Sequence, residues 1–270
     1  MLLSLHIIVY MPMLNMLVSN KTGIIIQART GSSRLPGKMT LPFFEDQNLI
    51  TLMINKFKQE AGRTPFVIAT TTASGDDIIV EICAKAGVPY FRGSENDVLD
   101  RFIKTAEHFR FETILRVCAD NPFFDVASTL LLARMLSTGK VDYMGYEMDG
   151  NQPSIMTHIG LWGEAVTLKA LVKTASLTND SLYREHVTNY LYSHPQTFNI
   201  GLTPAPNGLG KRTDLRFTLD TPEDYELYRK IYRQLAARGS TNNPEALVKL
   251  VDENNDFRKV MKNQITLNTK

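Results

Sequence analysis

A basic, glycine-containing loop near the start of the chain has the residue types that bind polyphosphate. It runs from Arg29 to Lys38 and contains three cations, two glycines, two serines and no acidic residue. The apolar run before it, residues 23–28, is typical of a buried strand. Backbone N–H groups and fixed positive charge at the carboxyl end of a strand suit phosphate oxygens. Arg29, Arg34 and Lys38 are therefore predicted to bind phosphate, the arginines in bidentate fashion.

This loop is not a Walker A motif, because five residues separate Gly31 from Gly37 and Met39 follows Lys38. The alternative is a solvated basic surface loop. Its position after an isoleucine-rich strand, together with two carboxylates further along the chain, favours phosphate binding.

Those carboxylates are Asp120 and Asp220, and each follows an apolar stretch and precedes a proline-containing turn that begins a helix. Mg²⁺ bound with a triphosphate takes few protein carboxylates and otherwise keeps water and phosphate oxygens. From the pattern alone, Asp120 favours metal binding. Asp220 stays open between a metal ligand and a helix-start residue, since the sequence Thr-Pro-Glu-Asp after it is a good helix start by itself.

Strands and helices alternate through the first half, which predicts a three-layer α/β/α sandwich with a mostly parallel sheet. The expected strands are residues 23–28, 65–70, 88–91, 113–118 and 141–145, and the expected helices are 49–59, 76–86, 97–108 and 124–136. In such sheets ligands bind beyond the carboxyl ends of the strands. The basic loop, the segment 70–75 and Asp120 all follow predicted strands, so a nucleotide site is expected there.

Local signals predict several helix ends and a less regular second half. Ser74 and Asp76 are possible caps of the helix 76–86, and Gly87 is its expected stop. Buried positions on helix 49–59 are expected at Leu52, Ile54 and Phe57. The second half predicts strands at 157–162 and 215–219, a helix from after Trp162 through Lys173, and helices at 183–192, 222–235 and 244–251.

Composition bounds the class of protein. The chain has 270 residues, 43% hydrophobic residues and a net charge of +2, which gives no global reason to expect nucleic acid or an anionic membrane. Cys83 and Cys118 lie in apolar patterns and are expected to be buried free thiols, as in a reducing compartment, so we expect a cytoplasmic protein. Neither cysteine has the spacing partners of a zinc site.

Residues 1–22 are expected to be an N-terminal extension, and residues 23–270 one nucleotidyltransferase domain. The apolar stretch 1–18 has no preceding Lys or Arg, no cleavage pattern and Pro12 in its middle, so stable membrane insertion is not expected. Two readings stay open: a packed or interfacial extension, or a segment upstream of a natural start at Met16. The second is preferred, because the first convincing strand begins at Gly23.

Five ordered motifs together resemble cytidylyltransferases that activate sugar acids. This family includes the 3-deoxy-manno-octulosonate and acylneuraminate cytidylyltransferases, and the resemblance is strongest to the spore-coat-polysaccharide cytidylyltransferase-like branch. It spans residues 23–235. The motifs are residues 27–38, 92–102, 116–122, 184–188 and 217–224.

The resemblance implies the nucleotide-diphospho-sugar-transferase fold, CTP as the nucleotide and Mg²⁺ as the cofactor. It implies that Asp120 and Asp220 bind the metal, and that these aspartates act with Arg29 and Lys38 in catalysis. The nucleotide-binding residues expected on this basis are Gln27, Ala28, Arg29, Gly31, Ser32, Arg34, Lys38, Thr71 and Ser94. For Thr71 and Ser94, placed near the base and ribose by position, turn and cap hydroxyls are the alternative.

Three further residues are candidate sugar contacts. His158 lies in a His-Ile-Gly sequence similar to one that borders the sugar site of the octulosonate enzymes, although a histidine in an apolar strand is more often a core residue. Arg184 and His186 flank Glu185 at a helix start, where they contact the sugar or a partner subunit, or cap the helix. The family favours homodimers, and the sequence leaves the oligomeric state open.

The predicted function is transfer of CMP from CTP to a sugar acid with release of pyrophosphate, for surface glycan biosynthesis. Its partners would be these two small molecules and no nucleic acid. The alternatives are a nucleotidyltransferase that uses another NTP or sugar, and a non-catalytic nucleotide-binding homologue. A glycosyltransferase usually presents an Asp-x-Asp metal motif, and none follows the predicted strands.

Overall fold

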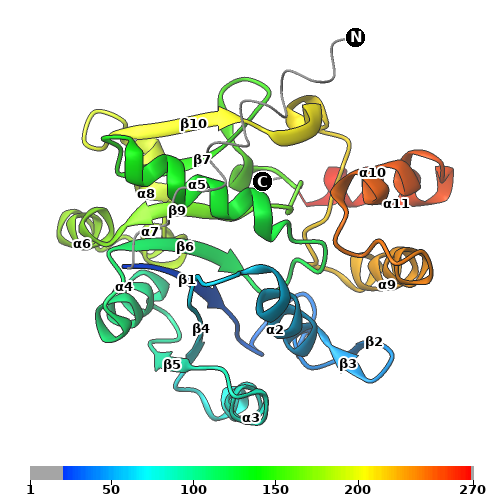
Figure 1. The fold of residues 1–270 in the computed structure, drawn as a ribbon, viewed down its shortest axis with the longest axis horizontal. Coiled ribbons are helices and arrows are strands. Elements are labelled where there is room, and N and C mark those ends of the chain that lie inside the picture. Colours follow the sequence, from blue (N-terminus) through cyan, green and yellow to red (C-terminus); the bar gives the residue numbers. More distant parts are fainter. Residues whose placement is uncertain (1–20, 269–270) are drawn as a thin grey trace.

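The structure is a computed structural model that describes residues 21–268, and a central sheet lies between two layers of helices (Figure 1). The predicted α/β/α sandwich with a mostly parallel sheet is confirmed. Most of the expected N-terminal extension, together with Met16, lies outside the described residues. Thr22 is already the first residue of strand β1, and Lys21 forms an ion pair with Glu112.

Within the described residues, eight strands form the main sheet in the order β10-β7-β9-β6-β1-β4-β5, with β8 paired to β7. Strand β9 runs antiparallel to β6 and β7, whereas β1, β4, β5 and β6 are mutually parallel, as are β7 and β10. The strands are β1 (Thr22–Gln27), β4 (Phe66–Thr71), β5 (Tyr90–Gly93), β6 (Thr113–Cys118), β7 (Tyr143–Met148), β8 (Gln152–Pro153), β9 (Glu164–Thr167) and β10 (Ile200–Pro204).

The side-chain alternation of β1 explains why both faces of the sheet are covered. Ile24 and Ile26 enter the apolar cluster on one face, and Ile25 enters the cluster on the other. The first cluster is closed by α2 (Leu49–Glu60), α3 (Asp77–Ala86), α5 (Val126–Thr138), α9 (Pro222–Ala237), α10 (Pro244–Asp252) and α11 (Asn255–Leu267). On the opposite face lie α4 (Val98–Phe109), α6 (Leu168–Leu177), α7 (Ser181–Glu185) and α8 (Asn189–Ser193).

The register of the parallel strands brings the polar loops to one edge. Gln27, the last residue of β1, pairs with Ala69 of β4 and with Cys118 of β6. The loops that follow these strands therefore emerge side by side. This is the physical reason why the basic loop and Asp120 share a neighbourhood.

Several predicted helix features are confirmed. Leu52, Ile54 and Phe57 are buried on α2. Gly87 ends α3 in the left-handed conformation, with φ of 63°. Thr221 caps α9, and its capping box with Asp224 is complete. Asp76 occupies the N-cap position of α3 as expected, but its side chain makes no cap hydrogen bond to that helix.

The strands predicted at 157–162 and 215–219 are also wrong. Both segments are largely buried and irregular, lie outside the sheet, and pair with each other through Phe217 N–H donating to His158 O (2.9 Å). Gly160 has φ of +59°, which breaks a strand, and a Cβ there would lie 2.8 Å from the Phe217 carbonyl carbon. The apolar segment 157–162 therefore runs across the segment 215–219 in the protein interior and does not form a strand of the sheet.

The remaining differences concern two strands of the sheet, short elements and the C-terminus. The helix predicted from after Trp162 through Lys173 is wrong in its first part, because Glu164–Thr167 form strand β9 between β6 and β7 and helix α6 begins only at Leu168. Strand β10, at the edge of the sheet, was not predicted. The helix predicted at 183–192 is two short helices, α7 and α8, separated by the segment 186–188. Helix α11 and the hairpin of β2 (Pro42–Phe44) and β3 (Gln47–Asn48) were not predicted, and short 3₁₀ turns cover Ser74–Asp76, Ser154–Met156 and Pro206–Lys211. None of the helices within residues 21–268 combines the length and hydropathy needed to cross a bilayer.

Candidate active site

The basic loop is a closed turn held at both ends. Gly37, with φ of +68°, donates its backbone N–H to the Thr30 carbonyl at 3.1 Å. Thr30 donates from its backbone N and its hydroxyl to Asp76 Oδ1, both at 2.7 Å. Asp76 Oδ2 in turn accepts from the hydroxyl and backbone N of Thr71 at the end of β4, at 2.5 and 3.2 Å. Asp76 therefore ties the loop to the neighbouring strand.

This hydrogen bonding outweighs burial in setting the charge of Asp76. Burial alone would raise the pKa of its carboxyl, but the hydrogen bonds from Thr71 and Thr30 hold that pKa below the ordinary value. The carboxylate is thus a permanent anchor for the loop at neutral pH.

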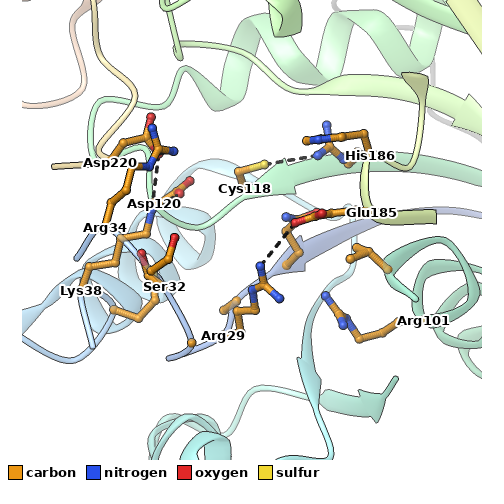
Figure 2. Close-up of a pocket in the computed structure, with 17 residues that line it drawn as sticks. Arg29, Ser32, Arg34, Lys38, Arg101, Cys118, Asp120, Glu185, His186 and Asp220 are labelled. Atoms are coloured by element: carbon orange, nitrogen blue, oxygen red, sulfur yellow. Dashed lines mark hydrogen bonds and ion pairs between the residues drawn. The ribbon is translucent and has the colours of Figure 1, made fainter. Parts of the chain in front are cut away.

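A cavity of about 280 Å³ lies over this loop at the carboxyl ends of β1 and β6 (Figure 2). Five cationic side chains and three carboxylates line it, which leaves a net charge of +2 and favours a polyanionic ligand. The lining residues are Gln27, Ala28, Arg29, Gly31, Ser32, Ser33, Arg34, Lys38, Met39, Val98, Arg101, Arg116, Cys118, Asp120, Glu185, His186 and Asp220.

Lys38 stands between the two predicted metal ligands at one end of the cavity (Figure 2). Its Nζ lies 2.5 Å from Asp120 Oδ2 and 3.9 Å from Asp220 Oδ1, and it also donates to the Leu219 carbonyl at 2.7 Å. Arg34 approaches Asp220 Oδ1 from the loop side at 2.9 Å. Two carboxylates separated by 100 residues thus face one ammonium group.

Asp220 is held by a buried network that the sequence analysis missed. Arg216, whose side chain is fully buried, donates to Asp220 Oδ2 at 3.2 Å and through two bonds to Asp224, at 2.8 and 2.9 Å. Asp224 Oδ2 also accepts the backbone N–H groups of Asp220 and Thr221, both at 3.0 Å. An arginine within an apolar run, eight residues before an acidic helix start, is the signal that would have revealed this network.

The other end of the cavity is rich in arginine. Arg29 forms an ion pair with Glu185 at 3.6 Å, and Arg101 projects from α4 toward Arg29 (Figure 2). Burial lowers the pKa of Arg101, and the charge of Arg29 lowers it further. Arg101 was also missed, although it lies on the buried stripe of α4 together with Val98 and Thr105.

Arg116 forms the back wall through a second buried network. Its Nη1 contacts Glu164 Oε2 at 2.6 Å, and Tyr143 donates to Glu164 Oε1 at 2.7 Å. The Thr188 hydroxyl donates to the same carboxylate at 2.9 Å, which fixes the segment between α7 and α8 against the sheet. Burial and the Glu164 carboxylate raise the pKa of Tyr143 well above its ordinary value.

The structure brings most of the predicted site residues together. Those that line the cavity are Gln27, Ala28, Arg29, Gly31, Ser32, Arg34, Lys38, Asp120, His186 and Asp220. Cys118 lines it too and is half-buried, so the prediction of a buried thiol is wrong for Cys118, whereas Cys83 is buried as expected.

Four predicted ligand contacts lie outside the lining of this cavity. Thr71 is buried against Asp76, and the Ser94 hydroxyl accepts the Asp97 backbone N–H at 3.0 Å.

The other two have protein partners as well. His158 Nδ1 lies 2.5 Å from Arg216 Nη1. Arg184 contacts Asp97 at 3.3 Å and donates to the Ala175 carbonyl at 3.1 Å. Contact of these four residues with substrate stays a prediction.

The aspartate end of the cavity has the donors for a divalent cation that is shared with a ligand. No cluster of three or more His, Cys, Asp or Glu side chains within residues 21–268 could hold a metal ion without further ligands. Mg²⁺ is typically bound by one or two carboxylates together with substrate phosphates and water. Asp120 and Asp220 match that donor set, because a carboxylate oxygen of each lies within 4 Å of Lys38 Nζ.

The mostly parallel sheet, flanked by helices and carrying the basic loop and the two carboxylates at one edge, is an α/β fold of the nucleotide-diphospho-sugar-transferase type. The cytidylyltransferase family model matches residues 23–257, and the chain belongs to this family.

Individual relatives agree with this assignment. The spore coat polysaccharide biosynthesis protein SpsF of Bacillus subtilis is 35% identical over 237 residues, which cover 86% of this chain and 94% of SpsF. The solved structure of a cytidylyltransferase from Leptospira borgpetersenii is similar with a TM-score of 0.77 and 28% identity, over 90% of this chain and 98% of that one.

A more distant structure, CMP:2-keto-3-deoxy-manno-octonic acid synthetase complexed with CTP, has a TM-score of 0.60 at 17% identity. The match covers 79% of this chain and 99% of that one. At this low sequence identity the similarity shows a shared fold only.

Proposed function

We propose that this protein transfers CMP from CTP to the hydroxyl group of a sugar acid and releases pyrophosphate, in the synthesis of a surface glycan. The observation that carries the proposal is the meeting of Asp120, Asp220 and Lys38 in one cavity beside the basic loop. Family membership supports cytidylyl transfer, and the relationship to SpsF supports glycan synthesis as the setting.

In this reaction the sugar oxygen forms a bond to the α-phosphorus while the bond from that phosphorus to the β-phosphate bridging oxygen breaks. The electron pair and the negative charge leave with pyrophosphate, and the proton of the sugar hydroxyl group is released to solvent water. Arg29, Arg34 and Lys38 would stabilise that charge, since they line the cavity from the loop. Most of the acceleration would come from positioning and charge neutralisation.

Arg34 and Lys38 would have to change partners for this role. In the structure they neutralise Asp220 and Asp120. Binding of the nucleotide would let both cations exchange carboxylate for phosphate oxygens, and the two carboxylates would then hold Mg²⁺. When bound, Mg²⁺ would neutralise charge on the α-phosphate and favour ionisation of the attacking hydroxyl group.

The test is a pyrophosphate-release assay that crosses CTP, UTP, GTP and ATP with a panel of ulosonic acids, with and without Mg²⁺. We expect release with CTP, with Mg²⁺ and with at least one acid. Release with a different nucleotide and none with CTP would contradict the proposal, as would release that is unaffected by removing Mg²⁺.

A matched pair of variants checks the site itself. Asp120→Asn should lower the rate on the order of 10²-fold or more, because it removes a preorganised charge from the reacting centre. Asp214→Asn removes an exposed carboxylate whose partner is Arg212, outside the cavity lining, and should leave the rate unchanged. Equal rates in the two variants would contradict the role of Asp120.

A further inference from the structure

Arg101 is a buried arginine that forms no ion pair with a carboxylate within residues 21–268, although Asp76, Asp97 and Glu95 act on its charge from a longer distance. Its relative exposure is 1%, and within residues 21–268 no carboxylate oxygen lies within ion-pair distance of it. Nη1 donates to the carbonyl of Ser94, a neutral group, and Nε is buried with no hydrogen-bond partner. A buried charge without a counter-ion destabilises a fold unless something else binds it.

The other cations that line the cavity are all paired. The pairs are Lys38 with Asp120, Arg34 with Asp220, Arg29 with Glu185 and Arg116 with Glu164. Arg101 therefore differs from the other four in the described part of the chain. Its guanidinium group points into the cavity toward Arg29, at the end opposite Asp220 (Figure 2).

The fold makes room for this side chain. Gly93, at the end of β5, lies against the aliphatic part of Arg101, and a Cβ on Gly93 would come within 2.8 Å of Arg101 Cγ. The absence of a side chain at Gly93 lets the arginine lie along the strand end and deliver its guanidinium group to the cavity. Packing of the Arg101 side chain against Gly93 thus fixes the position of the guanidinium charge.

We propose that Arg101 is an oxyanion-binding residue of the active site, which completes its charge balance with a ligand carboxylate or phosphate. This inference rests on the proposed function for the identity of the ligands. A guanidinium group with free N–H donors binds either oxyanion through paired hydrogen bonds. The two sources are the carboxylate of the sugar acid and a phosphate of the nucleotide.

The experiment compares three chains: the unsubstituted protein, Arg101→Met and Arg229→Met. Arg229 is the matched control, because it is a helical arginine that also donates to a backbone carbonyl, of Phe43, but it does not line the cavity. Dissociation constants are measured by calorimetry for CTP, inorganic pyrophosphate and 2-keto-3-deoxy-manno-octonic acid. Unfolding temperatures are measured without any probe.

We expect Arg101→Met to weaken binding of at least one probe by about tenfold or more, since a charge-assisted hydrogen-bonded contact is lost. Weaker binding of CTP and pyrophosphate assigns Arg101 to a nucleotide phosphate, whereas weaker binding of the sugar acid alone assigns it to the acceptor carboxylate. The unfolding temperature should stay equal or rise, because the substitution removes an unpaired buried charge. Arg229→Met should leave all three affinities unchanged.

Unchanged affinity of Arg101→Met for every probe would overturn the inference, and a lower unfolding temperature in that case would assign a structural role. The binding measurements need no turnover, so a wrong role for Arg101 can be distinguished from a wrong proposed function. If the unsubstituted chain binds CTP and releases pyrophosphate while Arg101→Met binds all probes normally, only the role of Arg101 is wrong. If the unsubstituted chain binds no probe, both proposals are wrong.

Discussion

Replacing Asp224 with asparagine tests whether the buried network beneath Asp220 stabilises the fold. The Asp224 side chain is 1% exposed and accepts two hydrogen bonds from Arg216, whose side chain is 0% exposed. Asparagine keeps the shape but leaves the guanidinium charge with Asp220 as its remaining carboxylate, at 3.2 Å. Breaking a buried ion pair costs about 3–5 kcal/mol. For a domain of this size that corresponds to a fall in unfolding temperature of roughly 6–20 °C.

The control is Asp214→Asn. Asp214 also receives two hydrogen bonds from an arginine, Arg212, at 2.7 and 2.9 Å, but the two side chains are 57% and 26% exposed. An exposed pair of this kind contributes about 0–1 kcal/mol. Calorimetry at neutral pH should therefore show a shift several times larger for Asp224→Asn. Equal shifts in the two variants would refute the argument that burial makes the Arg216 pair strong.

The same substitution should also affect the site. Arg216 holds Asp220 and Asp224 through one guanidinium group, and Asp224 accepts the Asp220 backbone N–H. Loss of the Asp224 charge leaves Arg216 to bind Asp220 more strongly, so Asp220 becomes less available to a cation. We expect weaker Mn²⁺ binding, measured in the presence of CTP well below the unfolding temperature. Unchanged Mn²⁺ affinity would limit Asp224 to a structural role.

Three further predictions concern the loop, its anchor and the cavity thiol. Gly37→Ala should destabilise the fold by about 1–2 kcal/mol because φ is +68° there. At Gly31 a Cβ would meet no described atom nearer than 3.5 Å, so Gly31→Ala should unfold at the same temperature as the unsubstituted chain but bind CTP more weakly. Equal CTP affinity would remove Gly31 from the site. Asp76 has a lowered pKa, so its contribution to stability is fully present above the ordinary value of 3.8 and is lost as the pH falls through the lower folded-state value. The difference in unfolding temperature between the unsubstituted protein and Asp76→Asn should therefore shrink as the pH drops below 3.8. A difference that stays constant with pH would contradict the assignment. Cys118 lines the cavity, whereas Cys83 is buried with its pKa raised to about 11, so iodoacetamide should modify Cys118 first. Bound CTP should slow the modification of Cys118. A labelling rate that CTP does not change would show that the nucleotide does not cover Cys118.

The first half of the fold was predictable because its signals are local. Strand β6 has the predicted bounds 113–118, and β1 and β4 differ from prediction by one residue at each end. Once the strands are parallel and in register, the loops after them must share an edge. The meeting of Lys38, Asp120 and Asp220 follows partly from this geometry and partly from the crossing of the segments 157–162 and 215–219, which local patterns do not reveal.

The residues that the sequence analysis missed depend on partners that the pattern does not name. Arg216 is interpretable only once Asp224 is seen to turn back toward it, and Arg101 only once its position on the inner face of α4 is known. The segment between α7 and α8 bends because the Thr188 hydroxyl is bound to Glu164, 24 residues earlier. Such contacts depend on tertiary packing, and periodicity does not encode them.

Crystallography with CTP and Mn²⁺, using the anomalous signal of manganese, tests the central claim most directly. The account predicts an anomalous peak within coordinating distance of both Asp120 and Asp220 and of a phosphate oxygen of CTP, with Lys38 displaced from Asp120 onto the nucleotide. A peak that contacts neither aspartate, or a triphosphate bound away from the loop 29–38, would contradict it.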